Sequence, residues 1–191
     1  MRDQTCCATG HGWNSPSRRF VIGGLACAAV ASTVALPSTR AWAQFAPNTA
    51  DDVKFMRLAI DEARQADYPF GAVIVRDGAI IARGRNLGRT DRDPTAHGEM
   101  VAIRRCLAER GPEPLRGATL YTSGEPCAMC MGAILWCHIG RLVFAASTAQ
   151  LATRIDQIML TAADVAAKAP FAPISITGGV LADEAMALFP K

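Results

Sequence analysis

Two kinds of hydrophobic pattern alternate along residues 51–189 of this chain. Apolar side chains recur every three or four positions over 51–66, which predicts an amphipathic helix. Short continuous apolar runs at 71–75 and 79–83 instead predict strands, and the Asp77-Gly78 pair between them predicts a hairpin. The same criteria predict strands at 118–121, 142–146 and 173–177, and helices at 127–136, 157–167 and 181–188.

One further helix has a start signal in the sequence. Asp93 is a typical N-cap residue, and Pro94 suits the first position of a helix. An apolar face then continues to Gly111, so we expect a helix that begins at Asp93 and ends before this glycine. Strands that alternate with helices are typical of a layered α/β domain, which we expect over residues 44–191.

Residues 1–43 have the pattern of an export signal rather than of a folded element. Ser17-Arg18-Arg19-Phe20 is followed by an apolar run to Leu36 and then by Ala41-Trp42-Ala43. A basic start, an apolar middle and small residues before the cut are typical of signal peptides, and paired arginines favour twin-arginine export in bacteria. We expect cleavage after Ala43, a periplasmic or secreted protein and no stable membrane anchor. A retained anchor over 20–36 is the alternative, although this run is barely long enough to cross a bilayer.

The positive charge of the chain belongs to this N-terminal segment. Residues 1–43 hold four of the 20 basic residues and one of the 17 acidic ones, so that 16 of each follow. A domain without net charge does not attract polyanions over long distances, and a nucleic-acid partner is therefore not expected. Whether Arg83, Arg85, Arg89 and Arg92 form a local basic patch or a solvated loop stays open.

Two short segments offer the ligands of a metal site: His97-Gly98-Glu99 and Pro126-Cys127-Ala128-Met129-Cys130. Both lie near predicted helix starts, where the positive end of the helix dipole stabilises thiolates. The spacing of Cys127 and Cys130 puts both sulfurs on one helix face, and His97 can supply a third ligand. Three protein ligands leave the fourth position of a zinc ion open, as in catalytic sites.

Glu99 is the carboxylate that such a site needs for proton transfer. In a regular helix, two residues correspond to a rotation of about 200°, so we expect a distorted first turn that brings Glu99 toward the ligands.

Each motif alone is compatible with a different kind of site. Cys-x-x-Cys also occurs as a redox dithiol or as half of a structural zinc site. A redox dithiol gives His97 and Glu99 no role, and a structural site needs a fourth ligand. His138 would lie about 12 Å along the helix from the motif. Cys106 and Cys137 are expected as small buried hydrophobes, with a disulfide between them as the alternative in an oxidising compartment.

Taken together, these segments resemble the cytidine deaminase-like superfamily, and most closely its bacterial guanine deaminases and tRNA adenosine deaminases. The resemblance rests on residues 69–73, 93–99, 120–134 and 179–184. It includes the His-x-Glu…Pro-Cys-x-x-Cys signature of zinc-dependent base deaminases. The resemblance implies a three-layer α/β/α fold around a five-stranded mixed sheet, one zinc ion per subunit and a homodimer.

The resemblance also implies a reaction and the residues that perform it. His97, Cys127 and Cys130 would bind Zn²⁺, and Glu99 would shuttle protons. The expected reaction is hydrolytic deamination of a small amino-substituted heterocycle, with release of ammonia. A guanine-type purine is favoured as the substrate, and a nucleoside is the second choice.

Other residues follow the family less completely. Asn86 corresponds to an asparagine that contacts substrate, and Phe70 and Trp136 to pocket walls, with ordinary core packing as their alternative. Gly98 replaces the usual alanine, and residues 151–157 lack the Gly-Phe-Asp-Asp of guanine deaminases. The basic C-terminal tail of tRNA editors is also absent from this sequence. A tRNA adenosine-to-inosine deaminase and a non-catalytic zinc-binding descendant therefore remain alternatives.

Overall fold

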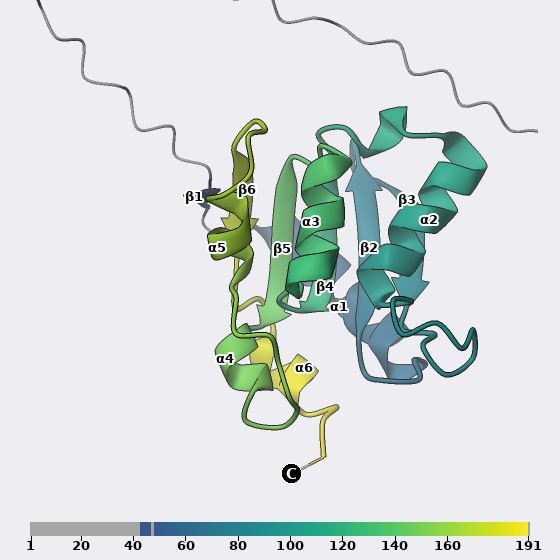
Figure 1. Cartoon of the computed structure of the whole chain (residues 1–191), viewed down its shortest axis with the longest axis vertical. Coiled ribbons are helices and arrows are strands. Elements are labelled where there is room, and N and C mark those ends of the chain that lie inside the picture. Colours follow the sequence, from purple (N-terminus) through teal and green to yellow (C-terminus); the bar gives the residue numbers. More distant parts are fainter. Residues whose placement is uncertain (1–42, 47, 191) are drawn as a thin grey trace, which may run out of the picture. The chain divides into compact units, whose positions relative to one another are not determined.

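A mixed six-stranded sheet organises the chain in the computed structural model, which describes residues 43–46 and 48–190 (Figure 1). In spatial order the strands are β1 (Ala43–Phe45), β6 (Ile174–Thr177), β5 (Arg141–Ala146), β4 (Thr119–Gly124), β2 (Gly71–Arg76) and β3 (Ala79–Arg85). The helices are α1 (Ala50–Arg64), α2 (Gly98–Arg110), α3 (Ala128–Trp136), α4 (Thr148–Leu151), α5 (Ala162–Ala166) and α6 (Ala182–Met186), with a 3₁₀ turn η1 (Glu113–Leu115).

The strand directions follow from the connections between the strands. β2 and β3 are antiparallel, and the residues of their turn, Asp77 and Gly78, have φ of 50° and 75°, as a two-residue hairpin requires. β4, β5 and β6 are parallel to one another because helical segments connect them. The five expected strands are confirmed. Residues 43–45, for which the sequence predicted no strand, form the additional strand β1 and pair with β6.

Helices cover both faces of the sheet, which confirms the expected three layers. Leu120 of β4 and Leu142 of β5 pack under α2, α3 and α5. Their neighbours Tyr121 and Val143 point to the opposite face and pack with α1 and α6. This alternation follows from the two-residue repeat of a strand. Figure 1 shows α2 and α3 side by side over the near face of the sheet.

Two helices begin later than the sequence signals indicated. Oδ1 of Asp93 accepts hydrogen bonds from the backbone N and the hydroxyl of Thr95, at 2.8 and 2.6 Å. Asp93 therefore closes a local turn, and α2 begins five residues later, at Gly98. The helix expected over 157–167 begins at Ala162, because a capping box starts it there.

Several other sequence expectations concern exposure and pairing. Cys106 and Cys137 are free cysteines that belong to the apolar packing under α2 and α3.

Among the described residues, no helix is long and apolar enough to span a membrane. The expected export signal lies outside the described residues except for Ala43 and stays a prediction.

A buried ion pair joins α1 to the sheet. Asp52 has no exposed surface and accepts two hydrogen bonds from Arg141 of β5, at 2.7 and 2.8 Å. It also accepts from the hydroxyl of Tyr121, at 3.0 Å, and from the backbone N of Thr49, at 2.7 Å. Burial alone raises the pKa of Asp52, but the hydrogen bonds from Arg141 and Thr49 outweigh burial and lower it.

Candidate active site

Three side chains with metal-binding atoms meet where α2 and α3 begin. His97 is the N-cap of α2, Cys127 is the N-cap of α3, and Cys130 lies in the first turn of α3. Nδ1 of His97 lies 3.7 Å from Sγ of Cys127 and 3.6 Å from Sγ of Cys130. All three ligand atoms lie within 4.8 Å of one another. The structure therefore brings together the three residues that the sequence predicted as metal ligands.

These distances suit a zinc ion. Tetrahedral zinc has bonds of about 2.3 Å to sulfur and about 2.0 Å to nitrogen, which separates the sulfur and nitrogen atoms by about 3.6 Å. The observed separations have this value without any rearrangement of His97, Cys127 or Cys130. The donor set of one imidazole and two sulfurs is also one that zinc prefers.

The pKa values of the two thiols are shifted in opposite directions. The hydrogen bond from Cys130 and the contact with His97 hold the pKa of Cys127 well below its usual range, although burial opposes this effect. The hydrogen bond with Cys127 and burial raise the pKa of Cys130. The hydrogen bond with Cys127 also raises the pKa of His97. One sulfur is therefore held as a thiolate, which is the form that binds metals.

Glu99 is a buried carboxyl beside this cluster. Its side chain is 4% exposed, and its Oε1 accepts a hydrogen bond from Thr122 of β4 at 3.2 Å. Burial raises its pKa, which favours a group that accepts a proton during a reaction. His97 precedes α2 and has an extended backbone, so the rotation expected between His97 and Glu99 in a regular helix does not apply. Both side chains line the same cavity. The first turn of α2 thus needs no distortion.

Close packing against the sheet sets the position of α2. A Cβ atom on Gly84 of β3 would collide with the carbonyl oxygen of Gly98 and the backbone N of Ala102. A Cβ atom on Gly98 would lie 3.1 Å from the carbonyl oxygen of Phe70, tighter than an ordinary contact. Glycine at positions 84 and 98 therefore lets the first turn of α2 approach the strands closely.

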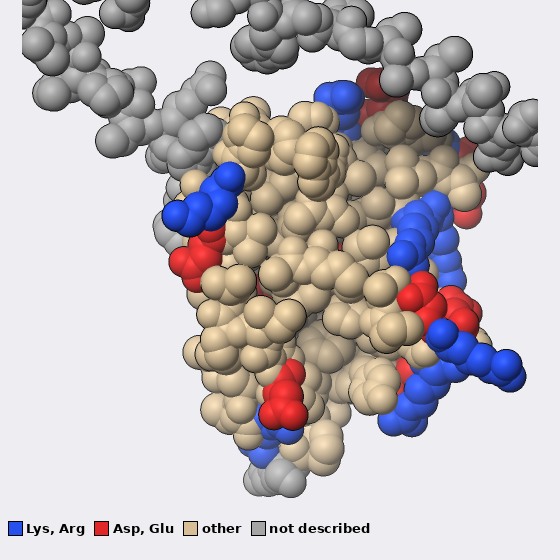
Figure 2. Space-filling view, viewed as in Figure 1, with Lys and Arg blue, Asp and Glu red and all other residues tan. Residues whose placement is uncertain are grey.

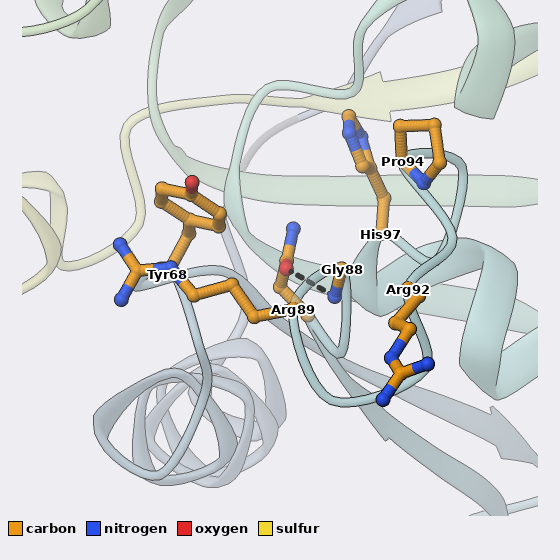
Figure 3. Close-up of a pocket in the computed structure, with 7 residues that line it drawn as sticks. Tyr68, Gly88, Arg89, Arg92, Pro94 and His97 are labelled. Atoms are coloured by element: carbon orange, nitrogen blue, oxygen red, sulfur yellow. Dashed lines mark hydrogen bonds between the residues drawn. The ribbon is translucent and has the colours of Figure 1, made fainter.

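Two cavities meet at His97. The inner cavity has a volume of about 60 Å³ and is lined by Phe70, His97, Glu99, Glu125, Cys127 and Gln157. The outer cavity has a volume of about 390 Å³ and is lined by Tyr68, Asn86, Gly88, Arg89, Arg92, Pro94 and His97. In Figure 3, Tyr68 and Arg89 form one side of the outer cavity, and His97, Pro94 and Arg92 form the other. His97 is therefore the residue that the two cavities share, and Glu99 lines the inner one.

Two of the expected substrate contacts line these cavities. Asn86 is buried, and its Oδ1 accepts a hydrogen bond from the backbone N of Gly88 at 3.0 Å. Its amide nitrogen makes no hydrogen bond to the described residues and is available to a ligand in the outer cavity. Phe70 lines the inner cavity and packs edge-on against Phe189, with their ring centroids 5.3 Å apart. Phe70 is therefore both a packing residue and a cavity wall.

The carboxylate of Asp67 holds the backbone at the rim of the outer cavity in place through three hydrogen bonds. Asp67 accepts hydrogen bonds from the backbone N of Arg89 at 2.8 Å and of Thr90 at 2.7 Å. It accepts a third from the hydroxyl of Thr90 at 3.0 Å. The guanidinium of Arg89 lies over the ring of Tyr68, 4.6 Å from its centroid. Asp67 was not apparent from the sequence, because a single aspartate before Tyr68 carries no local motif.

Trp136 lies away from these cavities. It ends α3, at the opposite end of the helix from Cys127, and is 72% exposed. Its ring packs against Phe171 at 4.7 Å and lines neither cavity at His97. The helix separates it from the ligands by about 1.5 Å per residue, so within one chain Trp136 is not a wall of this site, contrary to our expectation.

A comparison with protein families fits this geometry. The family described as the cytidine and deoxycytidylate deaminase zinc-binding region matches residues 49–146, about half of the chain. The chain belongs to this deaminase family. The match includes His97, Glu99, Cys127 and Cys130, which are the residues of the cluster and its neighbouring carboxyl.

Curated relatives of this deaminase-family chain divide between two activities. The guanine deaminase of Bacillus subtilis is 54% identical over 78 residues, which are 41% of this chain and 50% of that protein. The tRNA-specific adenosine deaminase of Agrobacterium fabrum is 46% identical over 101 residues, 51% of this chain and 66% of that protein. The matches thus span about half to two thirds of the length of these relatives.

Solved structures show the same division. A structure from work on tRNA:A34 deaminases is 34% identical, with a TM-score of 0.62 over 71% of this chain and 99% of that one. The guanine deaminase of Nitrosomonas europaea is 25% identical, with a TM-score of 0.58 over 71% of this chain and 81% of that one. These neighbours confirm the expected cytidine deaminase-like α/β fold and leave two substrate classes.

Proposed function

We propose that this family member is a zinc-dependent aminohydrolase that deaminates a small nucleobase, with a guanine-type purine favoured over a nucleoside. The observation that carries the proposal is the inner cavity, in which the buried carboxyl of Glu99 lies beside His97 and Cys127. Guanine deaminases among its relatives support the choice of substrate. The three ligands support one zinc ion per subunit.

The residues of the inner cavity have the chemistry that hydrolytic deamination requires. A bound zinc ion would supply Lewis acidity and lower the pKa of water toward neutrality. Glu99 is placed to accept a proton from the attacking water and to deliver it to the leaving nitrogen. The water oxygen adds to the amidine carbon, the C–N bond breaks, and ammonia leaves with the transferred proton. Thr122 donates a hydrogen bond to Oε1 of Glu99 and helps to hold the carboxyl in place.

The outer cavity supports binding of a base. Its volume of about 390 Å³ exceeds that needed for one purine ring system. The free amide nitrogen of Asn86 can donate a hydrogen bond to a ring acceptor, and Phe70 offers an apolar surface next to the reacting edge. Asn86 and Phe70 therefore orient the substrate in this proposal, and Glu99 performs the proton transfers.

The test is ammonia release by the zinc-loaded full chain with a panel of purine and pyrimidine bases and their nucleosides. We expect turnover of a guanine-type base, and a loss of about 100-fold or more in Glu99→Gln with the zinc content unchanged. Glu109→Gln is the matched control, because Glu109 is an exposed glutamate of the same helix. Activity retained in Glu99→Gln would refute the role of this carboxyl.

A tRNA adenosine deaminase is the second candidate. The tRNA deaminases among its relatives favour it, as do Arg89 and Arg92 at the rim of the outer cavity. The absence of net charge after residue 43 favours a small substrate. Inosine formation in a tRNA anticodon stem-loop, without turnover of free bases, would support the editor. Zinc binding without turnover of either substrate would indicate a non-catalytic descendant.

We also propose a homodimer through the face that carries α3. Trp136 and Met129 present exposed apolar surface there, Phe171 packs beside Trp136, and Figure 2 shows that most of the surface of this face is without charged side chains. Contiguous exposed apolar surface is typical of a protein interface. We expect a dimer in light scattering and a monomer for Trp136→Glu. A monomeric native chain would refute this assembly.

We further propose that residues 1–43 direct export by a twin-arginine route. The paired arginines and the Ala41-Trp42-Ala43 sequence support this localisation. The N-terminal sequence of the protein recovered from a periplasmic fraction should begin at Gln44. Recovery of only the uncleaved chain from the cytoplasm would refute export.

A further inference from the structure

Glu125 makes an unusual pair of hydrogen bonds next to the inner cavity. Its side chain is 8% exposed and lines this cavity, two residues before Cys127. One carboxylate oxygen accepts the backbone N of Thr148 and the other accepts the backbone N of Ala162, both at 2.8 Å. Thr148 and Ala162 are the first residues of α4 and α5. One side chain thus satisfies backbone donors at the starts of two helices.

The loop over residues 152–161 lies between these two helices. Because Glu125 binds the first residues of both α4 and α5, it fixes the elements that flank the loop. Within the loop, Gln157 is the residue that lines the inner cavity. Its side chain is half-buried and makes no hydrogen bond to the described residues. Glu125 therefore determines where an unpaired carboxamide meets the cavity that contains Glu99.

A carboxamide has one acceptor and one donor group side by side. It can make two hydrogen bonds to a ring edge on which an N–H and a carbonyl are neighbours, as in a lactam. A carboxamide is also neutral, so it does not compete with Glu99 for the transferred proton. In guanine-type purines, the lactam N–H is adjacent to the amino-bearing carbon and stays intact in the reaction. In adenine or cytosine, the corresponding donor is the amine that leaves.

We propose that Gln157 is a specificity-determining residue that hydrogen-bonds the lactam edge of a guanine-type substrate, and that Glu125 is the positioning residue that holds Gln157 in place. This inference rests on the proposed deaminase function and specifies its substrate class. The inner cavity of about 60 Å³ accommodates the reacting edge of a base, while the remainder of the ring lies in the outer cavity.

Guanine and 2-aminopurine form the matched test pair, because both carry the amino group on the same carbon and 2-aminopurine lacks the lactam. We expect Gln157→Leu to lower kcat/KM for guanine by about 5- to 150-fold, the range for a two-point amide contact to a base. The value for 2-aminopurine should change by less than threefold. Thr153→Ala in the same loop is the control and should change neither value, because its side chain bonds only the backbone of Gln150. An equal effect of Gln157→Leu on both bases, or no effect, would overturn the proposal.

Glu125→Gln tests the positioning role. A glutamine keeps one acceptor oxygen, so it can bind either Thr148 or Ala162 but not both. We expect the folded variant, with full zinc content, to show a raised KM for guanine and an unchanged KM for 2-aminopurine. Equal changes for both bases, or unchanged selectivity, would overturn this role. If Glu125→Gln does not fold, Glu125→Asp, which is too short to span both amides, is measured in the same way.

Binding separates the failure of this inference from the failure of the proposed function. Calorimetry with guanine is done on the zinc-loaded full chain and on Gln157→Leu. Binding of guanine that weakens in Gln157→Leu, without any turnover by the native chain, would refute the deaminase function and support the recognition by Gln157. Turnover with unchanged selectivity would refute only the role of Gln157. No binding and no turnover of guanine would overturn both.

Discussion

Replacing Asp52 by asparagine removes the charge of a carboxylate that has no exposed surface. The amide oxygen of the substituted side chain can still accept hydrogen bonds from one nitrogen of Arg141 and from Tyr121. Its NH₂ group, however, would face the second nitrogen of Arg141 and the backbone N of Thr49, which now bond Oδ2 at 2.8 and 2.7 Å. Two hydrogen bonds are thus replaced by contacts between donors.

The expected loss of stability follows from these two bonds. The bond to the charged Arg141 contributes about 1.5–3 kcal/mol and the bond to the backbone of Thr49 contributes about 1 kcal/mol. The side chain of Arg141 is 22% exposed, so water partly solvates its charge after the substitution. The loss is therefore expected near the lower end of the 3–5 kcal/mol or so for breaking a fully buried pair. We expect the free energy of unfolding to fall by about 3 kcal/mol.

Urea denaturation of the native chain and of Asp52→Asn, both freed of zinc so that the metal state is the same at pH 7 and at pH 3, measures this difference. With a slope of about 2 kcal/mol per molar urea, the midpoint should fall by about 1.5 M at pH 7. The pKa of Asp52 is lowered in the folded protein, so its charge stabilises the fold above the pKa of the unfolded chain. This contribution is lost as the pH falls through the folded pKa. The difference between the native chain and Asp52→Asn should therefore shrink toward pH 3.

Asp51→Asn provides the control, because Asp51 is an exposed acid in the same first turn of α1. Its stability should stay within about 0.5 kcal/mol of the native value. A loss below about 1 kcal/mol in Asp52→Asn, or a difference that stays constant between pH 7 and pH 3, would refute the reasoning about this ion pair.

Three further perturbations test the site and its support. Gly84→Ala should cost about 1–3 kcal/mol in urea denaturation and weaken zinc binding, because the new Cβ atom displaces the first turn of α2; unchanged values for both would contradict the close packing. Removal of zinc by a chelator should lower Tm, and added zinc should restore it; a Tm insensitive to zinc would argue against the metal site. Cys127→Ser should abolish stoichiometric zinc in metal analysis, while Cys106→Ser, whose sulfur is buried outside the cluster, should retain it.

Residues with local motifs could be predicted from the sequence. Cys127 and Cys130 are three residues apart at a helix start, and this spacing is enough to place both sulfurs together. The predicted start of α2 was wrong because an aspartate gives the same signal whether it caps a helix or a turn. Asp93 bonds the backbone two residues ahead, and the chain stays irregular until His97.

Residues that act through distant contacts could not be predicted. Glu125 bonds backbone groups 23 and 37 residues away, and no local pattern specifies those partners. Trp136 shares a helix with the cysteines, but the sequence alone does not show which end of the helix meets the cavity. The strand β1 also escaped prediction, because three residues paired at a sheet edge are too short to show a hydrophobic period.

The three hydrogen bonds that Asp67 accepts from Arg89 and Thr90 affect how a ligand would bind in the outer cavity. Fixing the backbone of one residue costs about 1–2 kcal/mol of conformational entropy. In this chain the three hydrogen bonds to Asp67 order the rim before any ligand arrives. A ligand in the outer cavity therefore meets a preorganised wall, and its affinity is not reduced by the cost of ordering the loop. Asp67 can thus increase the affinity for a ligand by ordering the rim in the free protein, without contacting the ligand.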